Sequence, residues 1–507
     1  MTRKKKLLLN SSSSLIYQLV KLLCGFILPR LFLIHYGSAV NGLVSSITHF
    51  LGFITLAECG VSAVVQSALY KPLAEKDDIE ISKIIISSER FFRKIAYLLI
   101  IYTVALMIIY PLVTSESFGY LFTALLILAI AINSFAEYYI GVTNQILLGA
   151  DQLGFIRYFI YVIALIVNTI ACVILMENGA SIHIVKLATS LIYVMQPLAM
   201  SMIVKKHYRI DRTIVLTEEP IKQKWNGLTQ HIAAVVLSNT DTVVLTLLST
   251  LENVSIYSVY FLVVNGVKQL LISLTNGIQA LFGNMLAKQE TEKLHQTFEG
   301  FEWGMHTVVT FIFSVTAILI VPFVSIYTKG IDDANYIVPA FGFLLTIAQA
   351  VHCLRLPYIS MVYAAGHYKQ TQFAAIIEAV INVLISVVLV FKFGLIGVAI
   401  GTLIAVLYRT CYFVIYLSKD ILCRKIKHFI KHMMTDVISA SILAVIVYSF
   451  DNFYSMSAQN YFAWIVLAIK VCITDAIIML FVNIVLYKKR IDAVLKMLLK
   501  RENYAEN

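Results

Sequence analysis

Residues 155–209 read FIRYFIYVIALIVNTIACVILM, ENGA, SIHIVKLATSLIYVMQPLAMSMIV and KKHYR, and this stretch decides the fold class. Two apolar runs, each longer than 20 residues, are separated by only four residues, and a basic cluster follows the second run. An α-helix needs about 20 apolar residues to cross the hydrocarbon core of a bilayer. The stretch therefore predicts two transmembrane helices joined by a short loop.

The rest of the chain repeats this pattern. Of its 507 residues, 59% are hydrophobic and 14% are charged, and the mean hydropathy is +0.83. A soluble protein of this length could not bury so much apolar surface. We predict an all-α polytopic membrane protein with about 14 transmembrane helices, at residues 13–34, 41–69, 95–114, 118–148, 155–176, 181–204, 229–250, 254–287, 304–328, 334–364, 371–392, 395–418, 435–451 and 460–486.

The positions of Lys and Arg predict the topology. If the N-terminus is cytoplasmic, the cytoplasmic segments hold about 31 of the 40 basic residues, and the external loops hold only Lys329 and Lys392. Basic residues accumulate on the cytoplasmic side of membrane proteins. We expect a multi-pass plasma-membrane protein with both termini in the cytoplasm. The net charge of +11 then reflects contacts with anionic membrane lipids rather than with nucleic acid.

An internal repeat predicts two similar halves. Residues 68–76 (ALYKPLAEK) resemble residues 280–288 (ALFGNMLAK), and Asn168 and Asn382 follow at a similar offset. Six helices per repeat is an even number, so both copies enter from the same side and form a parallel repeat. The predicted domains are an N-terminal six-helix lobe at 1–204, a cytoplasmic linker at 205–228, a C-terminal six-helix lobe at 229–418, accessory helices 13 and 14 at 419–487 and a cytoplasmic tail at 488–507.

The sequence does not contain the motifs that mark several classes of enzyme and metal-binding protein. No GxxxxGK[ST] loop is present, and the seven cysteines form no CxxC pair. The external loops are too short for a folded domain, and no nucleophile and base stand at a catalytic spacing. We therefore expect no enzyme, no cofactor and no metal site.

Short motifs near the N-terminus carry a family resemblance. They are Tyr36-Gly37, Asn41-Gly42-Leu43, Ala57-Glu58-Cys59-Gly60 and Leu69-Tyr70-Lys71-Pro72-Leu73-Ala74. With the helix pattern, they resemble the Wzx-like polysaccharide flippases of Gram-positive bacteria, within the multidrug/oligosaccharidyl-lipid/polysaccharide exporter superfamily. The resemblance implies translocation of an undecaprenyl-diphosphate-linked oligosaccharide from the cytoplasmic to the outer leaflet, for cell-surface polysaccharide export. It also implies alternating access, a bacterial cell membrane, and polysaccharide assembly proteins as possible partners.

Charged residues inside the spans are the candidates for function, because charge in hydrocarbon costs several kcal/mol unless it is paired or hydrated. A diphosphate needs cationic partners, and the guanidinium fork of Arg matches phosphate oxygens. The resembling flippases place basic residues of helices 1 and 8 in a central cavity. The candidate substrate-binding residues are Lys21, Arg30, Lys268, Arg355 and Arg409, with Asn265 and Gln279 beside them on a polar stripe.

The acids within the spans allow two interpretations. They could bind Na⁺ or H⁺ and couple its uptake to transport, or they could form salt bridges between helices. Lys470 and Asp475 are expected to form a structural pair or to border a lipid-tail groove. His49, His306 and His352 are expected to be core histidines. The candidate acids are Glu58, Glu137, Asp241 and Glu378.

Three other functions remain open. A cation-coupled multidrug exporter of the same superfamily would need an acidic, aromatic pocket. A membrane enzyme of polysaccharide assembly would need a large catalytic loop, which this sequence lacks. A purely structural scaffold would leave the buried charges unexplained.

Overall fold

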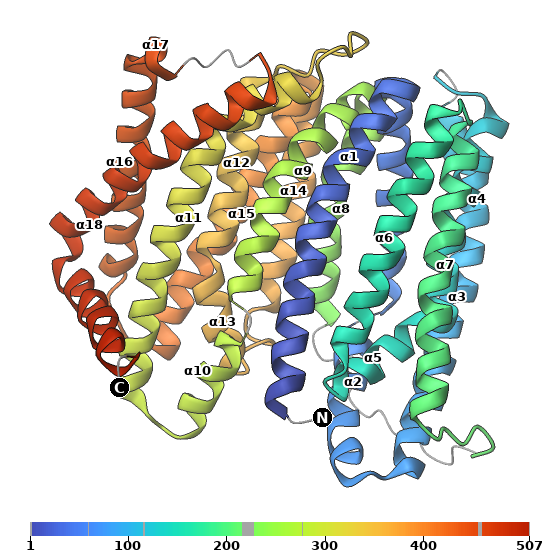
Figure 1. Ribbon diagram of the computed structural model, residues 1–507, viewed down its shortest axis with the longest axis horizontal. Coiled ribbons are helices and arrows are strands. Elements are labelled where there is room, and N and C mark those ends of the chain that lie inside the picture. The colour runs from blue at the N-terminus through green and yellow to red at the C-terminus, as the bar shows by residue number, and fades with distance from the viewer. Residues whose placement is uncertain are drawn as a thin grey trace. The chain divides into compact units, whose positions relative to one another are not determined.

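A computed structural model describes residues 3–58, 60–114, 117–214, 228–275, 277–454 and 459–505. Every regular element in these ranges is a helix (Figure 1), and thirteen helices are long and apolar enough to cross a membrane. The predicted all-α polytopic membrane fold is therefore confirmed. Residues 215–227, which make up most of the predicted linker, lie outside the described residues, as does Cys59 of the quoted motif.

Contacts divide the chain into two compact units. Unit 1 comprises Met1–Ser258 with Ile331–Ala334, and unit 2 comprises Val259–Gly330 with Asn335–Asn507. Helix α8 (Leu228–Leu248) packs on α1 (Arg3–Gly52), so it belongs to unit 1 by contact. Sequence repetition instead assigned α8 to the C-terminal lobe. Contacts and sequence repetition therefore assign α8 to different halves, and the predicted lobe boundaries stay a prediction.

Unit 1 begins with a broken helix. The backbone of Gly37 inside α1 has φ +81° and ψ 174°, a conformation that L side chains rarely adopt. The break lies between the predicted spans 13–34 and 41–69. Because α1 contains the first of these spans and the first part of the second, the two count as one membrane helix, and the total is thirteen instead of fourteen. The further elements are the 3₁₀ turn η1 (Phe53–Glu58), α2 (Val61–Glu75), α3 (Asp78–Val113), α4 (Tyr120–Ala136), the π-helical turn η2 (Glu137–Gly141), α5 (Val142–Ala150), α6 (Gly154–Glu177), α7 (Ile182–His207) and the first part of α9 (Leu251–Leu274).

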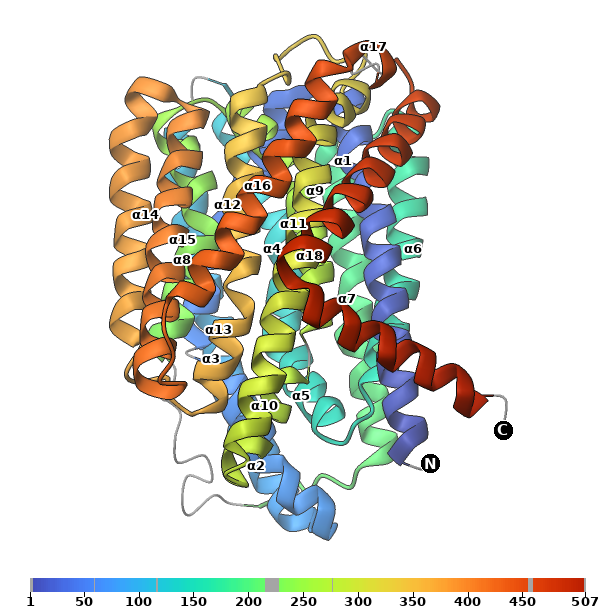
Figure 2. The same cartoon turned by 90° about the vertical axis from the view of Figure 1, so that its left-hand side faces the viewer.

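Unit 2 holds the rest of α9 and the C-terminal helices. Its accessory helices α16 and α18 pack on α11 around a core that includes Leu319, Leu443 and Val471 (Figure 2). The further elements are α10 (Ile278–Ala287), α11 (Thr291–Tyr327), α12 (Pro339–Leu354), α13 (Leu356–Ala364), α14 (Gln372–Phe393), α15 (Leu395–Tyr416), the π-helical turn η3 (Leu417–Ile421), α16 (Lys427–Ser449), α17 (Asp451–Tyr454) and α18 (Tyr461–Ala505).

The repeated sequence corresponds to a repeated backbone feature. Helices α2 and α10 each follow a glycine with positive φ, which is +72° at Gly60 and +90° at Gly277. Each is followed within two residues by a residue with φ +56°, Lys76 after α2 and Gln289 after α10. Left-handed conformations end helices because they turn the chain out of the helical path. Both halves thus contain a short helix between two left-handed residues.

The repeated asparagines also occupy similar positions. Asn168 on α6 is buried and donates to the Tyr193 hydroxyl on α7 at 3.2 Å. Asn382 on α14 is buried and donates to the Thr402 hydroxyl on α15 at 3.0 Å. In each half, an amide therefore joins two consecutive helices inside an apolar layer, where an unpaired polar group would be costly.

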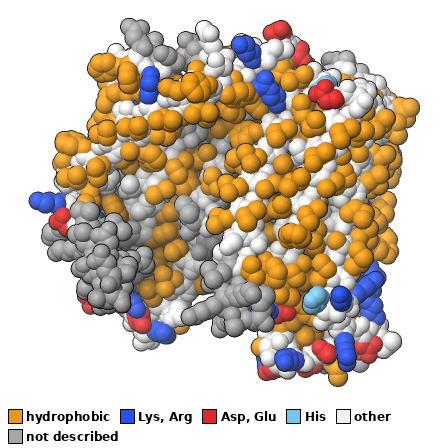
Figure 3. Space-filling view, in the orientation of Figure 1, with side chains coloured by type: hydrophobic (Ala, Val, Ile, Leu, Met, Phe, Trp, Pro, Cys, Tyr) orange, Lys and Arg blue, Asp and Glu red, His pale blue; other side chains and the backbone are white. Residues whose placement is uncertain are grey.

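The outward faces of the helices suit a lipid environment. Leu384, Val388 and Phe391 on α14 are each at least 60% exposed. Figure 3 shows hydrophobic side chains over α6 and α7, with charged side chains gathered towards the ends of these helices. Such a surface is stable only where hydrocarbon replaces water.

Candidate functional site

A carboxylate on α14 binds two arginines inside unit 2. Oε1 of Glu378 accepts a hydrogen bond from Arg355 at 2.6 Å, and Oε2 accepts one from Arg409 on α15. All three side chains are buried, with residue exposures of 0% for Glu378, 2% for Arg355 and 5% for Arg409. Buried charges are tolerated when they neutralise one another. The sequence allowed either ion coupling or salt bridging for Glu378, and in the structure it forms salt bridges.

A helix break places Arg355 in this group. Arg355 lies between α12 and α13, and Pro357 is the second residue of α13. Proline has no N–H to continue the hydrogen bonding of α12, but its fixed φ suits the first turn of a new helix. The carbonyl of Arg355 accepts from the N–H groups of Tyr358 and Ile359, both at 3.1 Å, which starts the new turn.

Three further residues extend the group towards α9. Lys268 donates from Nζ to Oε1 of Gln349 at 3.0 Å, and Arg355 donates from its second amino group to Nδ1 of His352 at 3.0 Å. Arg355, Arg409 and Lys268 are three cations of this group, and Glu378 is the carboxylate that binds both arginines. With His352 uncharged, the group has a formal surplus of two positive charges. We call Lys268, Gln349, His352, Arg355, Glu378 and Arg409 the cationic cluster.

The remaining predicted binding residues do not join this cluster in the described contacts. Lys21 and Arg30 belong to unit 1, where Lys21 is exposed and lies 6.0 Å from the Tyr17 ring centroid. Asn265 is half-buried on α9, three residues before Lys268. Gln279 on α10 is exposed and donates to the Tyr368 hydroxyl at 3.1 Å.

Three candidate acids of unit 1 accept hydrogen bonds from neutral groups. Glu58, at the end of η1, accepts from the Tyr138 hydroxyl at 2.6 Å. Glu137, at the start of η2, accepts from Gln145. Neither acid forms an ion pair with a residue that the structure describes. Asp241 on α8 is buried and accepts from the Tyr257 hydroxyl at 3.0 Å.

Lys470 and Asp475 are not the expected structural pair. Lys470 donates to the carbonyl of Phe453 at 2.7 Å, whereas both carboxylate oxygens of the buried Asp475 have no hydrogen-bond partner. Both residues are on α18. Because they are five positions apart, they lie on different faces of the helix, and their side chains are not expected to meet.

A second polar network in unit 2 was missed from the sequence. Glu302 on α11 binds Arg424, which had been assigned only a topological role, and His306 lies one turn further along the same helix. Glu302 and His306 are four residues apart, which places both on one helix face. This spacing was the sequence feature that could have indicated a shared polar network. Their partners lie more than fifty residues away, so sequence periodicity could not reveal them.

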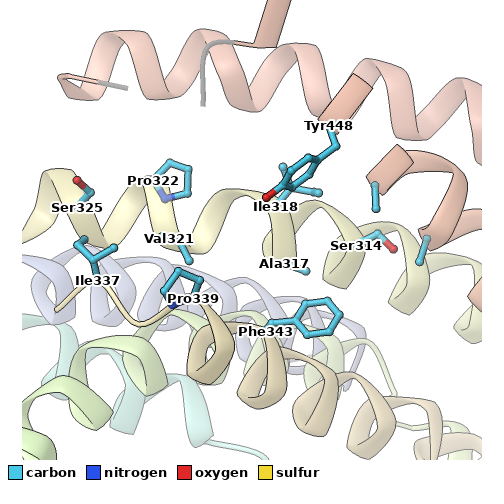
Figure 4. A pocket seen from close by; sticks show the side chains of 12 residues that line it. Ser314, Ala317, Ile318, Val321, Pro322, Ser325, Ile337, Pro339, Phe343 and Tyr448 are labelled. Carbon is cyan, nitrogen blue, oxygen red and sulfur yellow. The ribbon is translucent and has the colours of Figure 1, made fainter. Parts of the chain in front are cut away.

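An apolar groove runs along unit 2. Its volume is about 520 Å³, and it is bordered by α11, α12 and α16 (Figure 4). Ile318 and Pro322 of α11, Phe343 of α12 and Tyr448 of α16 line it. The groove has space for hydrocarbon beside an accessory helix.

Comparison with known proteins identifies a shared fold. No protein-family model and no curated protein sequence matches the chain. A solved structure of the lipid II flippase MurJ, in an inward closed conformation, superimposes with a TM-score of 0.70 at 14% identity, covering 96% of this chain and 100% of that one. An inward-facing multidrug resistance MATE transporter gives 0.56 at 14% identity, covering 80% and 94%. An outward-facing MATE structure gives 0.55 at 16% identity, covering 82% and 96%.

The comparisons differ in how much of this chain they cover, and the difference bears on the accessory helices α16 and α18. The MurJ comparison leaves 4% of 507 residues unmatched, about 20, which is fewer than the 23 residues of α16 alone. That comparison therefore includes residues of both α16 and α18, whereas the MATE comparisons leave about a fifth of this chain unmatched. The chain has the fold shared by the lipid II flippase MurJ and the MATE transporters of the MOP superfamily.

Proposed function

We propose that this protein is a flippase that moves an undecaprenyl-diphosphate-linked oligosaccharide from the cytoplasmic to the outer leaflet of a bacterial cell membrane. The observation that carries the proposal is the surplus positive charge of the cationic cluster, inside a fold shared with a lipid flippase. A diphosphate carries about two negative charges, which the surplus would balance. Transport by alternating access, with no chemical change in the substrate, would fit such a site.

Within the cluster, Lys268 is best suited to contact the diphosphate. It is half-buried and donates to the neutral amide of Gln349, whereas Arg355 and Arg409 are buried and bind Glu378. Its ammonium group has three donors, so it can bind a phosphate oxygen in addition to the amide of Gln349. Arg355 and Arg409 would add positive electrostatic potential near Lys268. The other predicted binding residues would contact the substrate at other stages of transport; they are Lys21, Arg30, Asn265 and Gln279.

The groove beside α16 would suit the lipid chain. An undecaprenyl chain is purely hydrocarbon, and the groove is lined mainly by apolar side chains such as Ile318, Val321 and Phe343. It would keep the chain against unit 2 while the headgroup crosses. This role of the groove depends on the proposed substrate, so evidence against that substrate would also count against the role.

The coupling ion would bind at the acids that lack a cationic partner. Glu58 and Glu137 are bonded to Tyr138 and Gln145, which are neutral. Either carboxylate could release its neutral partner and take up Na⁺ or H⁺ without breaking a salt bridge. Glu378 is already neutralised by two arginines, so it is a poor site for a cation.

Charge reversal at Lys268 tests the proposal. The purified Lys268→Glu variant, in vesicles containing a fluorescent undecaprenyl-diphosphate oligosaccharide, should translocate at least about tenfold less lipid than the wild type, since a tenfold loss needs only about 1.4 kcal/mol. Lys288→Glu is the matched control, because Lys288 is an exposed lysine at the end of α10. Normal translocation by Lys268→Glu would overturn the cationic site.

A multidrug exporter is the second candidate, and one observation favours it. Unit 1 contains both an acid bonded to an aromatic residue and a pair of tyrosine rings: Glu58 is bonded to Tyr138, and the rings of Tyr17 and Tyr161 are 5.6 Å apart. Cationic drugs bind such surroundings through carboxylates and aromatic faces. Expression in a drug-sensitive host separates the two functions. Resistance that depends on Glu58, together with no lipid translocation in vesicles, would favour the exporter.

A further inference from the structure

A small polar cavity lies in unit 1, at the end of α7. Its volume is about 110 Å³, and its polar lining consists of Ser201 and Lys205 of α7, Asn144 of α5, and Tyr208 and Arg212 of the segment that follows α7. Two of these residues are basic, and none of the lining residues that the structure describes is acidic. The cavity therefore offers hydrogen-bond donors and positive charge, which are the features that bind an anionic group.

Several donors at the cavity are not used within the protein. Neither the Ser201 hydroxyl nor the Lys205 ammonium group forms a hydrogen bond with a residue that the structure describes. Arg212 donates from one amino group to Oε1 of Glu89 at 2.7 Å, and a guanidinium group has five N–H donors. The remaining donors can serve a ligand whose oxygens accept several hydrogen bonds, such as a phosphate group.

The segment after α7 is fixed to its neighbours. Tyr208 donates to Oδ2 of Asp151 at 2.6 Å, in the turn between α5 and α6, and Asp151 also accepts from Nζ of Lys6 at 3.1 Å. The backbone N–H of Asp211 donates to the Ser82 hydroxyl on α3 at 3.0 Å. Because these contacts hold the segment in place, a ligand loses little affinity to ordering it.

Two acids near Arg212 leave the cavity positively charged. Glu89 is shared between Arg212 at 2.7 Å and Arg93 at 3.4 Å, so one carboxylate faces two guanidinium groups. Asp211 is exposed, and its Oδ1 accepts from the backbone N–H and the hydroxyl of Thr213, at 2.9 and 2.6 Å. Neither acid lines the cavity.

An exposed apolar stripe of α7 leads to the cavity. Leu191, Met195, Leu198 and Met202 lie on one face of the helix, and each is at least 37% exposed. Lys205 follows Met202 by three residues, which places it at the end of the same face. Figure 3 shows hydrophobic side chains over α7, with charged side chains gathered towards its ends. A lipid that lies along this stripe would therefore bring its headgroup to Lys205.

We propose that this cavity binds the phosphate group of an anionic membrane lipid, whose hydrocarbon chains lie along the stripe. Basic pockets at the ends of membrane helices bind such headgroups, because phosphate oxygens accept from Lys and Arg. The cavity is several times larger than the roughly 30 Å³ that a water molecule occupies in the liquid, which suits a phosphate group but not an oligosaccharide. No transport step is involved, so the inference does not depend on the proposed function.

Neutral substitution of Lys205 tests the site. The purified full-length protein, in neutral detergent micelles at about 0.15 M salt, is titrated with dye-labelled phosphatidylglycerol. We expect saturable binding by the wild type and at least about tenfold weaker binding by Lys205→Gln, which loses a charge-assisted hydrogen bond to the phosphate. An absence of saturable binding by the wild type would overturn the proposal.

Two further variants separate the cavity from the general charge of the surface. Lys206→Gln is the matched control, because Lys206 is the next exposed lysine of α7 and does not line the cavity, and its affinity should stay within about twofold of the wild type. Ser201→Leu fills the cavity and leaves Lys205 and Arg212 in place, so it should abolish saturable binding. Equal weakening in Lys205→Gln and Lys206→Gln, or unchanged binding by Ser201→Leu, would contradict the site. Thermal unfolding shows whether each variant folds, and the Lys205 and Lys206 pair decides the question if Ser201→Leu does not.

Competition identifies the molecule that carries the phosphate. Unlabelled phosphatidylglycerol should displace the labelled lipid, whereas phosphatidylcholine, which has no net charge, should displace it at least about tenfold less effectively. Inorganic phosphate that competes as well as unlabelled phosphatidylglycerol would support the phosphate site but overturn the lipid as its ligand. Equal displacement by the two phospholipids would show that the cavity does not select an anionic headgroup, and it would overturn the proposal.

Discussion

The two halves of the molecule share backbone breaks but place opposite charges there. In unit 1, the turn η2 after α4 carries Glu137, bonded to the neutral Gln145. In unit 2, the break between α12 and α13 carries Arg355, bonded to Glu378. A break in a membrane helix brings a polar side chain and backbone together inside the apolar layer, and it is tolerated where other groups satisfy it. The two helix interruptions therefore hold an acid in unit 1 and a base in unit 2.

The difference teaches which charges depend on one another. Glu378 binds both Arg355 and Arg409, so the loss of its charge leaves two buried arginines without this carboxylate. Glu58 and Glu137 in unit 1 accept from the neutral Tyr138 and Gln145, so a neutral replacement there leaves no cation behind. Three substitutions test this contrast.

Glu378→Gln should have the largest effect. It leaves Arg355 and Arg409 buried without their carboxylate, which should cost about 3 to 5 kcal/mol of unfolding free energy. Thermal unfolding of the purified protein measures the loss. Glu137→Gln is the matched substitution in unit 1 and should change stability by less than about 1 kcal/mol. Equal losses at the two positions would remove the contrast between the halves.

Gly401→Ala should have an intermediate effect. A Cβ on Gly401 of α15 would lie 2.8 Å from the backbone nitrogen of Ser386 on α14, so the two helices would have to separate. Overpacking of this kind costs about 1 to 3 kcal/mol. Gly300→Ala on α11 is the control, because a Cβ there meets nothing within 4 Å. A Tm for Gly401→Ala no lower than that of the control would show that α14 and α15 are not tightly packed.

Gly141→Ala should have the smallest effect on stability and a specific effect on Glu137. The new Cβ would lie 2.7 Å from Oε2 of Glu137, and a flexible side chain can move away. We expect a stability loss below about 1 kcal/mol. If Glu137 carries the coupling ion, the ion dependence of transport should shift as the carboxylate moves. An ion dependence identical to that of the wild type would exclude Glu137 from coupling.

The sequence predicted the membrane class and most helices, and the reasons are physical. The length of apolar runs is set by bilayer thickness, so spans such as 155–176 and 181–204 are found as α6 and α7. The repeat of residues 68–76 and 280–288 corresponds to helix ends with left-handed residues. The extension of α3 back to Asp78 was not predicted, because hydropathy does not register a helix that continues into water.

The sequence by itself determined that this chain belongs in a lipid bilayer and which apolar runs form its membrane helices. These properties depend on the apolar length and on the energy of charge in hydrocarbon, both of which are local. Only the tertiary structure decided the partners: Glu378 with Arg355 and Arg409, Glu302 with Arg424, and Asp475 without a hydrogen bond. Partner choice depends on which helix faces meet across long chain separations, and no local pattern encodes that.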